Sequence, residues 1–237
     1  MSDQKLRELE CRWRETGSVE DEAAYLRQRV RVGDLTQERL ELAAYCGHEG
    51  ASAATNLGPP RLGLEGWACG LSAFGQAVSV RALVALGRLQ LATWELLYPE
   101  DHTQREALES AEQWLLSQAG PRSLASAKTA SYARERAYLA RICRDPDGSE
   151  YLAASVAAAA AFAAAAECDL VSEPERVSRA ELCLQGCVAE LIAWGAPELT
   201  EDTARNAMTG SLIEWALGLG ASKPSLPDID TPPSARD

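Results

Sequence analysis

Apolar side chains recur every three or four residues along nearly the whole chain, and this period matches one face of an α-helix. Alanine, leucine, glutamate and arginine, which are strong helix formers, dominate the sequence. Strand signals are weak, because the chain has only two phenylalanines and few runs of β-branched residues. The sequence therefore predicts an all-α protein, an irregular bundle or a helical-repeat-like stack of about nine to ten helices.

Capping residues and glycines mark where many of these helices begin and end. Ser18, Thr36 and Thr200 stand where a hydroxyl can accept a hydrogen bond from the first turn of a helix. Gly33 and Gly47 stand where a helix can end. The predicted helices cover residues 4–14, 18–32, 36–46, 49–56, 64–98 with an interruption near Gly75, 103–118, 123–144, 150–167, 174–194 and 200–219.

The clearest internal break is the segment Leu-Gly-Pro-Pro-Arg-Leu-Gly at residues 57–63, whose two prolines cannot continue a helix. We therefore predict an N-terminal helical unit over residues 1–57 and a main helical bundle over residues 64–220. Residues 221–237 hold four prolines and little apolar content, which is typical of a disordered tail.

Charge and cysteine content argue against several classes of function. The formal charge of −12 disfavours binding to nucleic acid and docking on anionic lipid. The uncharged, alanine-rich stretch at residues 151–166 is shorter than the roughly 20 residues that span a membrane. The chain opens without a signal-peptide pattern, and its seven cysteines are scattered and odd in number. We expect a cytoplasmic protein with reduced, mostly buried thiols.

The thiols give no clear nucleophile or metal site. Cys46 and His48 are close in sequence, but Gly47 between them predicts a helix end that turns their side chains apart. We expect a buried thiol and a capping or surface histidine. Cys183 and Cys187 share a helix face, while zinc needs about four ligands and nothing nearby supplies the others. The sequence leaves open a redox or metal role for Cys46 or for this pair.

The carboxylates likewise give no clear catalytic or metal site. Glu106, Glu109 and Glu112 follow one another at a spacing of three residues, but the Glu-x-x-His motif of di-iron bundles is absent from the sequence. His102 lies in the first turn of a predicted helix, where we expect it to be solvated. We therefore predict no catalytic residue, no cofactor and no metal, and we disfavour an enzyme that uses Cys46 or the carboxylates.

The segment from Pro99 to Leu115 resembles the alpha-helical immunity proteins of bacterial polymorphic toxin systems. In that family a proline-containing turn leads into an Arg-x-Ala-aliphatic-Glu-x-Ala helix that ends in tryptophan, and the resemblance covers about the middle third of this chain. The family's Gly-His-Ala element is absent from this sequence, so the resemblance implies no role for a histidine. The matching positions are Pro99, Arg105, Ala107, Leu108, Glu109, Ala111 and Trp114.

We therefore predict a non-enzymatic, cytoplasmic binding protein that neutralises a partner protein, which the resemblance implies is a toxin. The alternative is a helical adaptor or regulator of another intracellular enzyme, such as a protease or a kinase. Acidic charge would speed association with a basic partner. Of the six tryptophans, we expect most in the core and one or two at an interface. The candidate contact residues are Glu100, Asp101, Glu109, Glu112, Glu173 and Glu175.

Overall fold

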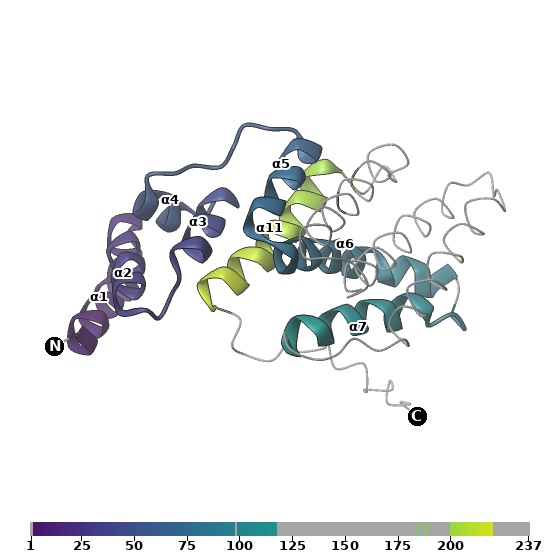
Figure 1. Ribbon diagram of the computed structural model, residues 1–237, viewed down its shortest axis with the longest axis horizontal. Helices are drawn as coiled ribbons and strands as arrows, with labels where there is room; N and C mark the ends of the chain where they lie inside the picture. Colours follow the sequence, from purple (N-terminus) through teal and green to yellow (C-terminus); the bar gives the residue numbers. More distant parts are fainter. Residues whose placement is uncertain (1, 98, 118–183, 185–187, 189–199, 220–237) are drawn as a thin grey trace, which may run out of the picture.

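A computed structural model describes residues 2–97, 99–117, 184, 188 and 200–219 of the chain (Figure 1). These residues form eight α-helices and one short 3₁₀ helix, without any strand, so the all-α prediction is confirmed for this part of the protein. The helices predicted over residues 123–144 and 150–167 lie outside the described residues, as do most of the helix predicted over 174–194 and the tail over 221–237. Among the helices described here, none is long and apolar enough to cross a membrane.

From α1 to α7 the helices follow one another through short connections, apart from one longer loop. Figure 1 shows this loop, residues 57–63, running between the fourth and fifth helices without regular structure, as its prolines predict. The elements in chain order are α1 (Ser2–Thr16), α2 (Val19–Val32), α3 (Gln37–Tyr45), α4 (Glu49–Thr55), α5 (Leu64–Gly70), η1 (Leu71–Phe74), α6 (Gln76–Leu97), α7 (Thr103–Ser117) and α11 (Glu201–Leu217).

Three predicted N-caps are confirmed. The hydroxyl oxygens of Ser18, Thr36 and Thr200 each accept a hydrogen bond from the backbone N–H three residues on, at 3.1, 3.3 and 3.1 Å. Each bond satisfies a donor that the first turn of a helix leaves without a partner. The starts of α2, α3 and α11 therefore follow directly from single side chains in the sequence.

The end of α3 is set by Gly47, whose φ of 91° is a left-handed conformation that favours glycine. Its N–H donates to the carbonyl of Ala44 at 2.9 Å, and the next N–H, that of His48, donates to the carbonyl of Ala43 at 3.0 Å. This pair of bonds is the Schellman motif. It turns the chain sharply from α3 into α4, so the predicted stop at Gly47 is confirmed.

One hydrophobic core runs through the described helices, from Leu26 of α2 to Leu217 at the end of α11. The helix that makes it continuous is α11, which packs on both α6 and α3 (Figure 1). Its buried stripe is Ala204, Met208, Leu212 and Ala216, at a spacing of four residues. The last helix in the sequence thus fills the space between the first helices and the middle of the chain.

Arginines from three places in the fold hold α11. The carbonyl oxygen of Leu217 accepts a hydrogen bond of 2.6 Å from Arg29 of α2, and that of Trp215 accepts one from Arg39 of α3. Both cations lie at the carboxyl end of α11, where the helix dipole places negative charge. Further along, Arg205 of α11 donates to the carbonyl of Leu62 at 2.6 Å and so ties α11 to the loop before α5.

The apolar period of residues 200–219 predicts that Ala207, Leu212 and Trp215 are buried, but Ala207 and Trp215 are only half-buried. The spacing of four in the observed stripe turns the buried face of α11 away from the one predicted. As a result Trp215 lies at the edge of the core, where it packs against the apolar cluster on one side and contacts two arginines as well.

Gly70 at the end of α5 should be intolerant of a side chain. A Cβ atom there would lie 2.9 Å from Cζ of Tyr45 and closer still to its hydroxyl oxygen, which donates to the carbonyl of Trp67 at 2.8 Å. We expect Gly70→Ala to lower the free energy of unfolding by roughly 1–3 kcal/mol, because Tyr45 must move and lose this bond. Urea denaturation measures the change.

Gly66 in the same helix is the matched control. A Cβ atom at this position meets Leu62 at an ordinary contact distance of 3.5 Å. Gly66→Ala should therefore leave the stability unchanged or raise it by up to about 1 kcal/mol through better helix propensity. Equal effects of the two substitutions would show that Tyr45 is not held against Gly70.

Candidate functional site

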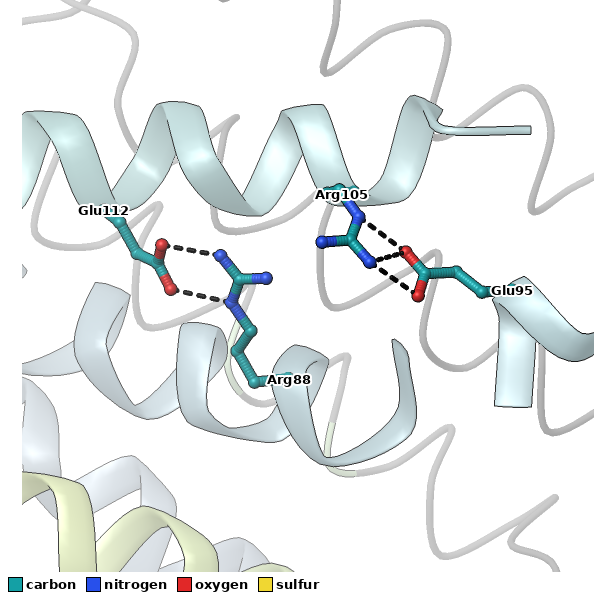
Figure 2. A network of polar contacts seen from close by, with 4 residues as sticks. All are labelled: Arg88, Glu95, Arg105 and Glu112. Carbon is teal, nitrogen blue, oxygen red and sulfur yellow. Dashed lines mark hydrogen bonds and ion pairs between the residues drawn. The ribbon is translucent and has the colours of Figure 1, made fainter. Parts of the chain in front are cut away.

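Helices α6 and α7 are joined by two bidentate ion pairs (Figure 2). Nε and Nη2 of Arg88 donate to the two carboxylate oxygens of Glu112 at 2.8 and 2.7 Å. Nε and Nη2 of Arg105 donate to those of Glu95, both at 2.7 Å. The later residue on α6 pairs with the earlier residue on α7, so the two helices run antiparallel. Forked contacts of this kind fix orientation as well as distance.

Electrostatics keep this connection charged. The pKa of Arg88 is raised above its usual value, first by the hydrogen bond to Glu112 and then by the charges of Glu112, Glu109 and Glu95, although burial opposes the shift. The side chains of Arg88 and Glu112 are 32% and 37% exposed, so solvent screens the pair and its effect on stability is modest. Its main consequence is to hold α7 in one register on α6.

The close packing of α7 on α6 requires a glycine on α6, because a side chain at that position would collide with α7. A Cβ atom on Gly87 of α6 would lie 2.6 Å from Cδ2 of Leu108, which is fully buried on α7. Leu108, Ala111 and Leu115 form the buried face of α7. Apolar contacts on this face and the ion pairs at its margin together leave α7 little freedom to rotate.

The outer face of α7 is an exposed stripe that begins just before the helix. We call it the α7 face, and its members are separated alternately by four and three residues, which places them on one side of the helix. Two of them are carboxylates and the last is a leucine that is 80% exposed. The members are His102, Glu106, Glu109, Gln113 and Leu116.

The apolar period of residues 103–118 predicts that Leu116 points inward beside Leu115, and this prediction is wrong. Leu115 is 6% exposed and completes the buried face, and the next residue lies about 100° further round the helix. Leu116 therefore reaches solvent at the end of the α7 face. The solvated position expected for His102 is confirmed, because that residue is exposed.

The predicted contact residues do not form one group. Glu109 is exposed in the middle of the α7 face, and Glu100 is exposed in the turn that precedes α7. Asp101 is half-buried, and Glu112 is engaged by Arg88. Glu173 and Glu175 lie outside the described residues. Glu106 was not among the predicted contacts, although its spacing of three from Glu109 places both residues on one helix face.

Cys46 and His48 are arranged as predicted. Nδ1 of His48 accepts a hydrogen bond of 3.2 Å from the N–H of Ala51 and caps α4, while its Nε2 lies 3.7 Å from a carboxylate oxygen of Glu22. Cys46 is buried at the end of α3, and burial raises the pKa of its thiol to about 12. A nucleophilic cysteine needs the opposite shift. Cys183 and Cys187 lie outside the described residues.

The three glutamates of α7 do not gather into a metal site. Glu112 turns to Arg88, whereas Glu106 and Glu109 face solvent. Across the described ranges, histidine, cysteine, aspartate and glutamate side chains form no group of three or more that could hold a metal ion.

Comparisons of the chain with protein-family models, with curated proteins and with solved structures give no significant match.

The link between Arg88 and Glu112 can be measured by a double-mutant cycle. We expect Arg88→Ala and Glu112→Ala to show a coupling of roughly 0.5–1 kcal/mol in the free energy of unfolding, which falls as salt is added. Glu109→Ala, on the exposed face, should change stability by less than about 0.5 kcal/mol. Strictly additive effects of the first two substitutions would contradict the pairing.

The reactivity of the cysteines tests whether Cys46 is buried and Cys11 is exposed as the structure shows. Cys11 is exposed, whereas Cys46 is buried with a thiol that stays protonated at pH 8. In the native protein we expect iodoacetamide to modify Cys11 and to leave Cys46 unmodified until the chain unfolds, because the thiolate is the reacting form. Mass spectrometry of peptides after a timed reaction gives the ratio, and comparable rates at the two sites would contradict the structure.

Proposed function

We propose that this protein acts without catalysis, by binding a partner protein that carries a basic surface and blocking it. The observation that carries the proposal is the α7 face, because it is rigidly mounted on α6 and presents Glu106, Glu109 and the exposed Leu116 on one side. A partner that covers this face would meet two negative charges and then an apolar contact.

Rigidity supports a role in recognition. A helix held by two bidentate ion pairs and a buried apolar face pays little conformational entropy when a partner binds. Carboxylates that are already exposed attract a basic surface from a distance, and the overall charge of −12 adds to this attraction. The expected result is fast association with cationic partners, with strong dependence on salt.

The sequence resemblance suggests what the partner is. The segment that resembles the immunity proteins, Pro99 to Leu115, includes most of α7 and contains Glu109 among its matching positions. The same segment therefore supplies both the resemblance and the exposed acidic face. On this basis the partner is a toxin whose active surface is basic, and binding neutralises it.

Co-expression with the product of the adjacent gene tests this proposal. If that product arrests growth and this chain restores it while forming a complex, the proposal is supported. A stable complex with a protein that is not toxic would instead favour the adaptor or regulator of another enzyme. Absence of both rescue and complex would contradict neutralisation of that product.

Charge reversal on the α7 face should slow binding. We expect the double variant Glu106→Lys, Glu109→Lys to reduce the association rate with the partner at low salt by roughly tenfold or more, and the difference to shrink as salt screens the charges. Surface plasmon resonance at several ionic strengths measures this.

The double variant Glu20→Lys, Glu38→Lys is the matched control, since it makes the same change in net charge with two exposed acids on α2 and α3, away from α7 in Figure 1. It should retain nearly the original association rate. If it slows association as much as the α7 variant does, the effect comes from net charge and the α7 face is not the contact.

A further inference from the structure

Two arginine side chains lie over the ring of Trp215. The guanidinium carbon of Arg39, from α3, lies 4.8 Å from the centre of the Trp215 ring, and that of Arg81, from α6, lies 4.6 Å from it. Both distances are within the range of a cation–π contact. Three helices that are distant in sequence thus place two positive charges on one aromatic side chain.

Neither of these two charges has a carboxylate within ion-pair distance in the described part of the chain, although the charge of Asp34 favours the Arg39 cation. Arg29 pairs with Asp34 at 2.6 Å, but neither Arg39 nor Arg81 takes part in any ion pair found there. The Nε atoms of Arg39 and Arg81 are enclosed by protein and lack a hydrogen-bond acceptor. A buried donor without an acceptor is costly and calls for an explanation.

The pKa values of both guanidinium groups are lowered, in keeping with the cost of burying them. Burial first, and then the nearby charge of Arg39, together lower the pKa of Arg81 to about 10. The pKa of Arg39 is also lowered, by burial first and then by Arg29, although the charge of Asp34 opposes the shift. Water therefore solvates these cations poorly, and they repel one another.

All three side chains are nevertheless partly exposed, so the group lies at the surface and a solute can approach it. Stacking on the indole fixes the plane of each guanidinium. The Nε atoms are enclosed and Nη2 of Arg39 donates to the carbonyl of Trp215, so the sites for a further bond are the two Nη groups of Arg81 and Nη1 of Arg39. Paired N–H edges match the oxygens of carboxylate and phosphate groups, and such charged bonds are stronger than neutral ones.

We propose that Arg39 and Arg81, held on Trp215, form a binding site for a small oxyanion, either a carboxylate or a phosphate group. An anion there would relieve the repulsion between the two cations and replace the solvation that they lack. The negative charge of the whole protein does not prevent this, because it is screened beyond about 8 Å at physiological ionic strength. The site is independent of the proposed function, since it involves α3, α6 and α11 but not the α7 face.

Thermal unfolding of the full chain in Tris chloride tests the site, with inorganic phosphate and malonate as the two probes and sodium chloride at matched ionic strength as the reference. We expect phosphate or malonate to raise Tm saturably, by roughly 3 °C at tenfold the dissociation constant. The probe that acts at the lower concentration identifies the preferred oxyanion. If neither exceeds sodium chloride, the site does not exist.

Arg205 supplies the control variant. It also stacks on a tryptophan, 5.4 Å from the centre of the Trp67 ring, but its guanidinium already donates to the carbonyl of Leu62. Arg81→Gln should abolish the difference between oxyanion and chloride, and Arg205→Gln should retain it. An unchanged response in Arg81→Gln would overturn the assignment.

Nuclear magnetic resonance keeps the test decisive if Arg81→Gln fails to fold. The enclosed Nε–H protons of Arg39 and Arg81 should exchange slowly with water and be observable in the unaltered protein. Addition of the effective oxyanion should shift both signals and leave that of Arg205 in place. Signals of Arg39 and Arg81 that do not move would overturn the proposal.

Discussion

The described fold depends on the hydrogen bonds and apolar contacts between the carboxyl-terminal end of α11 and the first helices of the chain. Its last carbonyls accept hydrogen bonds from Arg29 and Arg39, and its buried stripe fills the space between α3 and α6. The arginines and the dipole of α11 attract one another, and the apolar contacts make the arrangement specific. Without α11, the N-terminal helices and α6 would share far less of the core.

The two regions to which we assign functions differ in how the protein treats charge. Between α6 and α7, Arg88 and Arg105 are each neutralised by a carboxylate of the opposite helix. The remaining acids of α7, Glu106 and Glu109, are exposed to solvent or to a partner. At Trp215 the opposite holds, because two cations are brought together without a carboxylate from the described residues. One region offers negative charge to a macromolecule, and the other offers positive charge to a small ligand.

The sequence predicted the helices well because their signals are local. Ser18, Thr36, Thr200 and Gly47 act within one turn of their own positions, and the break at residues 57–63 follows from its prolines. The candidate site was predicted only in part, as Glu109, because exposure depends on which neighbour covers a face. Pairing of Glu112 with Arg88 spans 24 positions, and the contacts of Trp215 join three distant helices, so no local pattern reports them.

The contact between Arg29 and the carbonyl of Leu217 joins residues 188 positions apart, and this has a consequence for biosynthesis. A ribosome that adds 5–20 residues per second needs roughly 10 to 40 s to make the intervening chain. During that interval the side of α3 that packs on α11 stays uncovered, and exposed apolar surface of this kind is what chaperones bind and what makes nascent chains aggregate. The final packing of these helices is therefore a late event that follows translation of α11.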